Sequence, residues 1–75
     1  MKEETLDTII NFCIANDAEL TLTLLSIKVF INFNEGDRYE DTFVDEGNLY
    51  FWNYMFNHWN VIPVKEIIKA EFVVE

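Results

Sequence analysis

The chain has 75 residues, of which 51% are hydrophobic and 16% aromatic, and fourteen acidic side chains face five basic ones for a formal net charge of −9. This length allows one domain spanning residues 1–75, and the excess of carboxylates excludes direct binding to nucleic acid or to anionic membranes, whose phosphates it would repel. The single cysteine excludes an internal disulfide, and no motif calls for a cofactor.

The N-terminal residues and the apolar runs argue against secretion and membrane insertion. Met1-Lys2-Glu3-Glu4 is not a signal peptide. The longest apolar run, residues 24–31, is interrupted by polar side chains and falls short of the about 20 residues that cross a bilayer. We therefore expect a cytoplasmic protein, in the host-cell cytoplasm if a phage encodes it.

Residues 3–16 are predicted to form a helix. Acidic side chains occupy its first turn, where the helix dipole favours negative charge, and apolar side chains recur at three-and-four spacing. The resulting stripe is Leu6, Ile9, Ile10, Cys13 and Ile14. Phe12 falls outside the stripe and should be partly exposed, and Asn16 and Asp17 should end the helix.

Residues 20–33 are predicted to be β structure, because apolar and polar side chains alternate there. The alternation changes phase at Leu24–Leu25, which a bulge or bend would explain. The stretch 34–37 is a turn signal, and residues 38–44 are predicted to form a second strand beside the first. That hairpin would place Phe33 near Tyr39 and Val29 near Phe43.

After a second turn signal at residues 45–48, residues 49–56 carry no charge and many aromatic side chains. Aromatic residues favour pleated surfaces, so a strand is the preferred interpretation. Tyr50, Trp52, Tyr54 and Phe56 would then share one face and Leu49, Phe51 and Met55 the other. Both faces would be apolar, and one helix covers only one of them. The alternative is a helix over residues 48–60 capped by Asn48, which gives the order α-β-β-α-β.

Residues 61–64 are predicted to be extended, 64–68 to form a helical turn and 69–74 to form a closing strand. The fold class is α+β: an N-terminal helix packed on an antiparallel meander sheet of four to five strands. A sheet of this size would curl, and closure toward a small barrel is the extreme case.

The order helix, hairpin, hairpin, short turn and final strand resembles the layout of Sm-like RNA-binding proteins over roughly residues 3–74. The resemblance lies mainly in the Ile-Pro-Val-Lys-Glu-Ile-Ile stretch, residues 62–68, before the last strand. No motif of that family is matched residue by residue. The chain lacks the basic residues that RNA binding needs, so this function is not carried over.

Carboxylates are concentrated in the predicted hairpin region, where only Arg38 opposes six acids. Their order does not match a calcium-binding loop, and a chain this short has little room for a catalytic cleft. Cys13 lies on the apolar stripe, as a core thiol does. We therefore predict neither a metal site nor catalytic residues, and not an enzyme.

The remaining function is recognition of a protein. Aromatic side chains are typical of binding hot spots, and carboxylates attract basic surfaces such as those that hold nucleic acid. We expect a phage-like or mobile-element-type inhibitor that mimics nucleic acid on a basic, nucleic-acid-binding protein. The alternative is a structural module that self-associates, for instance as a homodimer. The candidate partner-binding residues are Glu35, Asp37, Glu40, Asp41, Asp45, Glu46, Tyr50, Trp52 and Tyr54.

Overall fold

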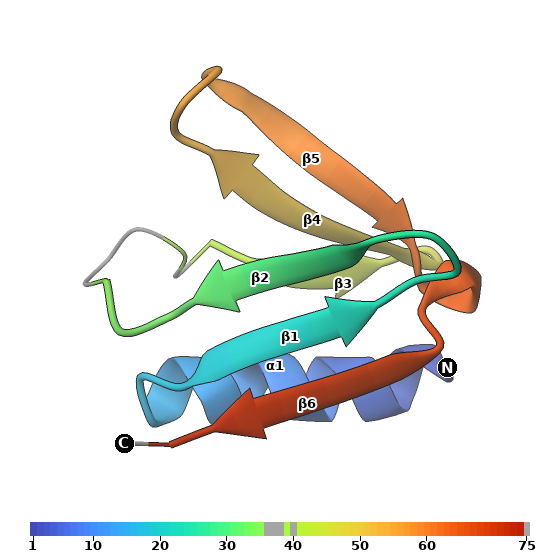
Figure 1. The fold of residues 1–75 in the computed structure, drawn as a ribbon, viewed down its shortest axis with the longest axis horizontal. Coiled ribbons are helices and arrows are strands. Elements are labelled where there is room, and N and C mark those ends of the chain that lie inside the picture. The colour runs from blue at the N-terminus through green and yellow to red at the C-terminus, as the bar shows by residue number, and fades with distance from the viewer. Residues whose placement is uncertain (36–38, 40, 75) are drawn as a thin grey trace.

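The computed structural model describes residues 1–35, 39 and 41–74 and shows an α+β fold with two small antiparallel sheets (Figure 1). The first sheet has the strand order β2-β1-β6 and the second β3-β4-β5. In chain order the elements are α1 (Glu3–Ala15), β1 (Glu19–Thr23), β2 (Lys28–Asn32), β3 (Phe43–Asp45), β4 (Asn48–Asn53), β5 (His58–Pro63), the 3-10 turn η2 (Val64–Glu66) and β6 (Lys69–Val73).

Helix α1 confirms the prediction for residues 3–16. Leu6, Ile10 and Cys13 from the predicted stripe are buried. The helix ends where the Asn16 backbone N–H and side-chain Nδ2 both donate to the Phe12 carbonyl oxygen, at 3.1 and 2.9 Å. The Phe12 ring is half-exposed and lies 5.1 Å from that of Phe72 on β6, so it packs at the border of the core.

Of the two predicted explanations for the phase change at Leu24–Leu25, a bulge or a bend, the structure shows a bend at residues 25 and 26 that reverses the chain. The Leu24 N–H donates to the Ile27 carbonyl at 2.9 Å, and β1 and β2 then pair antiparallel along their full length. Leu25 and Ser26 lie in this turn without the glycine, proline or asparagine that usually marks one. A chain reversal shifts the buried apolar side chains from even to odd positions, and a bulge does the same. The alternation of apolar and polar residues therefore does not distinguish a reversal from a bulge.

The first and last strands lie side by side. Strand β6 pairs antiparallel with β1 along all five residues, and η2 brings the chain from β5 to this position. The predictions of a helical turn near residues 64–68 and of a closing strand are confirmed. The partner of that strand was not predicted, because pairing between distant segments leaves no local pattern.

The second sheet is a meander of β3, β4 and β5. The strand interpretation of residues 49–56 holds for β4, and the alternative helix over residues 48–60 is wrong because β4 and β5 occupy that range. The expected strand over residues 38–44 is shorter, since β3 begins at Phe43 and pairs with β4, not with β2. Phe33 and Tyr39 nevertheless meet edge to face at 6.3 Å.

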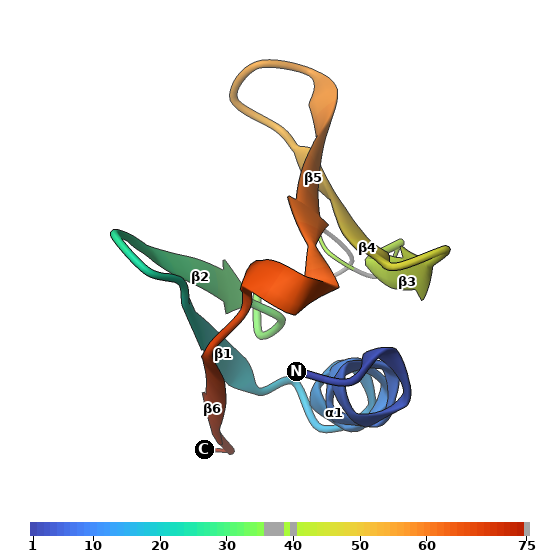
Figure 2. The ribbon, with the colours of Figure 1, turned by 90° about the vertical axis from the view of Figure 1, so that its right-hand side faces the viewer.

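The expectation of one sheet of four to five strands is therefore wrong. Six described strands divide into two sheets of three, with β2 at an edge of the first sheet and β3 at an edge of the second. Among these strands no ladder joins the two sheets, and a curl toward a barrel is not confirmed. Figure 2 shows the two sheets set at an angle, with α1 on the open side between them.

The core fills the space between the two sheets and α1. Leu22 from β1, Leu49 from β4, Ile67 after η2 and Leu6 and Ile10 from α1 are fully buried or nearly so. All three layers thus contribute large apolar side chains to one cluster. Within the described residues, no helix has both the length and the apolar character that a membrane crossing requires.

Burial of Cys13 should protect its thiol. Desolvation raises the pKa of this group, because the interior disfavours the thiolate. We expect Cys13 in the native protein to react slowly with a thiol reagent at mildly alkaline pH and readily in urea. Stability should fall as the pH rises above about 8.5, the ordinary thiol pKa, because ionisation then favours the unfolded chain. Urea titrations of wild type and Cys13→Ala would test this, since the variant should lose that part of the decline.

Candidate functional site

The outer face of the second sheet is apolar. In β4, Leu49 and Phe51 point into the core, while Tyr50 and Trp52 alternate with them and are half-buried on the other side. The antiparallel register sets Tyr50 opposite Phe43 of β3 and Trp52 opposite Trp59 of β5. Aromatic side chains from all three strands therefore meet on the side that α1 and the first sheet do not cover.

The rings on this face form a continuous cluster. Phe43 and Tyr50 stack with centroids 4.9 Å apart, and Phe43 meets Trp59 edge to face at 5.6 Å. Trp52 and Trp59 are 5.3 Å apart in a second edge-to-face contact. Val61, directly opposite Tyr50, is 49% exposed, and Phe43 and Trp59 are each 42% exposed. We call these five side chains the aromatic face.

The first sheet provides an internal comparison. Its outward positions include Thr21 and Thr23 on β1 and, on β6, a Lys69–Glu71 ion pair at 3.4 Å. Phe30 on β2, 70% exposed, has no ring contact within the described residues. A solvated outer face of this mixed kind is ordinary for a small sheet. A cluster of large aromatic side chains on the second sheet is not, and such patches mark interaction sites.

Negative charge borders the aromatic face, and positive charge is absent from this part of the sequence. Asp45 follows Phe43 at the next outward position of β3, and Glu46 lies in the turn to β4. Between residues 39 and 64 the sequence contains no lysine or arginine. A positively charged surface could therefore approach this face without meeting a like charge on these strands.

The four described acids among the predicted binding residues lie in two separate places. Of the described ones, Glu35 follows β2 and Asp41 precedes β3, whereas Asp45 and Glu46 lie at the β3–β4 turn. Figure 1 places the C-terminal end of β2 and the β3–β4 turn on opposite sides of the molecule. The predictions for Asp37 and Glu40 lie outside the described residues.

Near the β3–β4 turn lie further acids that are not among the predicted binding residues. Glu3 shares a surface recess with Glu46, and a second recess is lined by Glu3, Glu4, Asp7 and Val44. These helix residues were interpreted only as favourable partners of the helix dipole. These side chains lie near β3 because of the way α1 packs against the sheets, and a local sequence pattern does not predict that packing. No three carboxylate, histidine or cysteine side chains of the described chain come together as a metal site requires.

The turn between β4 and β5 projects beyond the core (Figure 1). Tyr54 was expected on the same strand face as Tyr50 and Trp52, but it belongs to this turn with Met55 and Phe56. The Asn53 side-chain Oδ1 accepts the Met55 and Phe56 backbone N–H groups at 3.0 and 3.1 Å. Met55 and Phe56 are 82% and 68% exposed, so the turn presents apolar side chains on a hydrogen-bonded frame.

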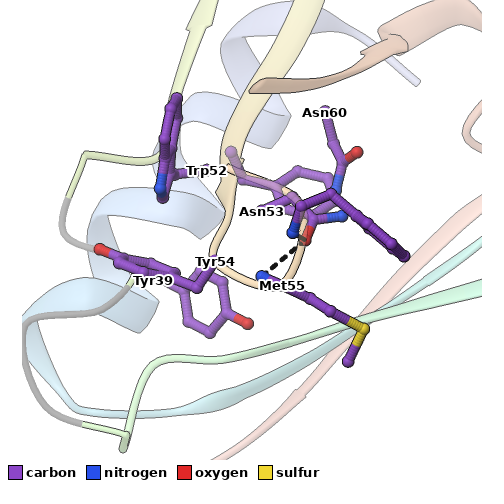
Figure 3. Close-up of a pocket in the computed structure, with 8 residues that line it drawn as sticks. Tyr39, Trp52, Asn53, Tyr54, Met55 and Asn60 are labelled. Atoms are coloured by element: carbon purple, nitrogen blue, oxygen red, sulfur yellow. Dashed lines mark hydrogen bonds between the residues drawn. The ribbon is translucent and has the colours of Figure 1, made fainter. Parts of the chain in front are cut away.

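Beneath this turn lies a hollow of about 400 Å³ (Figure 3). The rings of Tyr39, Phe51, Trp52 and Tyr54 line it together with Asn53 and Asn60. In Figure 3 the labelled rings lie to one side and the two asparagines to the other.

Removing the Asn53 side chain should loosen the turn. Asn53→Ala deletes the acceptor of two backbone N–H groups, and each hydrogen bond of this kind contributes about 1 kcal/mol. We expect amide hydrogen exchange of Met55 and Phe56 to become about fivefold faster. Asn53→Asp keeps an oxygen at the same position and should retain the protection. Equal exchange in wild type and Asn53→Ala would contradict the role given to this side chain.

Comparisons of the chain with protein-family models, curated proteins and solved structures found no match. The Sm-like layout suggested by residues 62–68 is thus not supported by a family match.

Proposed function

We propose that this protein is a small acidic binding module that occupies a basic, nucleic-acid-binding site on a partner protein. It would act as an inhibitor, or nucleic-acid mimic, of the phage or mobile-element type, and no catalysis is assigned to it. The observation that supports the proposal is the aromatic face, with Asp45 beside it and no lysine or arginine between residues 39 and 64.

The two components of this surface would make different contributions. Tyrosine and tryptophan bury large areas and dominate binding hot spots, so the aromatic face would supply most of the affinity. Carboxylates steer a cationic partner toward the surface and raise the association rate, an effect that salt screens. Asp45 and Glu46 are the described carboxylates next to this face, and the net charge of −9 extends the attraction over the whole molecule.

Self-association is the second candidate function. The exposed aromatic face favours it, because a second copy would cover the same apolar area. The charge argues against it, since each copy carries a net −9 and like charges repel on assembly. Sedimentation velocity at several protein and salt concentrations would separate the two candidates. A dimer that is stable at low salt would favour self-association.

Capture at two ionic strengths tests the proposed function. The immobilised protein is exposed to a bacterial lysate at low and high salt, and the retained proteins are challenged with duplex DNA. We expect basic nucleic-acid-binding proteins to be retained at low salt and released by either salt or DNA. Retention of proteins that DNA does not displace, or no retention of basic proteins, would count against the proposal.

A variant that lacks the two carboxylates beside the aromatic face makes this experiment more specific. Asp45→Asn combined with Glu46→Gln removes the two carboxylates beside the aromatic face, and we expect slower association and weaker low-salt retention. Glu71→Gln removes one carboxylate from β6 on the first sheet, where it pairs with Lys69, and serves as the control. If both variants lose retention equally, general charge and not this face is responsible.

A further inference from the structure

We propose that the hollow beneath the β4–β5 turn receives an arginine side chain of the basic partner protein. This inference rests on the proposed function and specifies the chemical group that the partner inserts. The observation that carries it is one recess lined both by aromatic rings and by two asparagines, with the labelled rings on one side and the asparagines on the other (Figure 3).

Ring–ring contacts hold the aromatic side chains of the hollow in place. Tyr39 meets Tyr54 edge to face with ring centroids 6.1 Å apart and an interplanar angle of 84°. On its other side Tyr39 contacts the buried Phe33 ring at 6.3 Å, and Trp52 is held by Trp59. Rings fixed by such contacts lose little freedom on binding, and a guanidinium group stacks on aromatic faces more readily than other cations do.

The polar side supplies a hydrogen-bond acceptor. The Asn53 oxygen already accepts two backbone N–H groups, which fixes that wall. The Asn60 carboxamide makes no hydrogen bond with the described part of the chain, and it lies on β5 directly opposite the buried Phe51. A guanidinium group carries five N–H donors in a planar fork, so it can donate to Asn60 while it stacks on a ring.

Charge selects among the groups that could fill this space. Strands β3, β4 and β5 contain no lysine or arginine, and Arg38 beside Tyr39 lies outside the described residues. A cation therefore meets no repulsion from these three strands, whereas a carboxylate or phosphate faces an acidic molecule. An apolar side chain would leave the Asn60 carboxamide without a partner. A second copy of this chain would bring another net charge of −9, so repulsion disfavours it as the occupant. The volume of about 400 Å³ is at the small end for ligand pockets, which suits one side chain.

A capped glycine-arginine-glycine tripeptide is the probe for this site. Two-dimensional ¹⁵N NMR at low salt would follow the Asn60 side-chain amide and the Trp52 indole N–H during titration. We expect saturable shifts of both signals, with smaller shifts for the lysine tripeptide. The tripeptide with citrulline, which keeps the shape of arginine without its charge, should leave them nearly unchanged. Equal responses to arginine and citrulline, or shifts confined to other parts of the chain, would overturn the inference.

Paired variants locate the effect. Tyr54→Ala removes a ring from the hollow, and we expect the affinity for the arginine tripeptide to fall about 2- to 30-fold, the range of a cation–π contact. Asn60→Ser tests the acceptor independently. Phe30→Ala removes an exposed ring from the first sheet and should leave the affinity unchanged, and chemical shifts elsewhere report whether each variant is folded. Unchanged affinity in both hollow variants would overturn the proposal.

The outcomes are distinguishable from those of the proposed function. The tripeptide titration needs no partner protein, so it reports on the hollow even if the lysate experiment fails. If a basic partner binds at low salt with equal affinity to wild type and Tyr54→Ala, the proposed function stands and the arginine pocket is rejected. Concentration-dependent shifts of the Trp52 and Asn60 signals before any peptide is added would indicate a second copy in the hollow and would also reject it.

Discussion

Leu22→Ala is expected to lower the free energy of unfolding by about 2–5 kcal/mol. Leu22 is fully buried on β1, the central strand of the first sheet, so the substitution leaves a cavity that neighbouring side chains fill only in part. A domain of this length has a total stability of about 4–11 kcal/mol. The variant should therefore lose a large fraction of this stability, and with a total near the lower end of the range it would be unfolded at ambient temperature.

The chain contains a matched control for this substitution. Leu25 lies three residues further on, in the β1–β2 turn, and is 92% exposed. Leu25→Ala removes the same atoms from solvent-exposed space and should change stability by less than about 0.5 kcal/mol. Urea titrations followed by tryptophan fluorescence and circular dichroism would measure both. Similar losses for the two variants would show that the described core does not stabilise the fold.

Trp59→Ala should reduce binding of the basic partner by about 30-fold or more, the loss expected for a hot-spot side chain. Trp59 contacts both Phe43 and Trp52, so its removal opens the middle of the aromatic face. At 42% exposure it should be less critical for folding than the core side chains. Affinity for the partner captured at low salt, measured by calorimetry, would give the value.

Phe30→Ala is the control for the aromatic face, because it removes an exposed aromatic ring from the outer side of the first sheet. We expect it to bind the partner as wild type does. A loss of affinity with Phe30→Ala equal to that with Trp59→Ala would mean that exposed apolar area in general, and not this face, drives the association. Unfolding curves of both variants would exclude loss of the fold as the cause.

The sequence predicted those parts of the fold that depend on local alternation. The apolar stripe of α1 and the in-and-out pattern of β4 follow from the spacing of side chains along one segment, and both were placed correctly. The turn at Gly47 was also found, and this glycine adopts a φ of 80°; the predicted turn at Gly36 lies outside the described residues. The turns at Leu25 and at Met55 were missed, because apolar side chains continue through them.

The candidate site could be predicted only in part for the same reason. Tyr50 and Trp52 lie on one strand, so their common face was readable from the sequence. Phe43 and Trp59 join them only through the register of β3 and β5 with β4, and Tyr39 reaches the hollow through a ring contact with Tyr54. These contacts join separate elements. The binding roles of the acids and aromatics remain predictions that the experiments above address.

The pairing of β1 with β6 has a consequence for synthesis in the cell. The central strand of the first sheet, β1, is made well before β6, which is one of its two neighbours. Until residues 69–73 leave the exit tunnel, one edge of β1 stays open and the apolar side chains meant for the core have no complete cover. The first sheet is therefore complete only after residues 69–73 have been made, and the nascent domain is most exposed to aggregation or proteolysis before then.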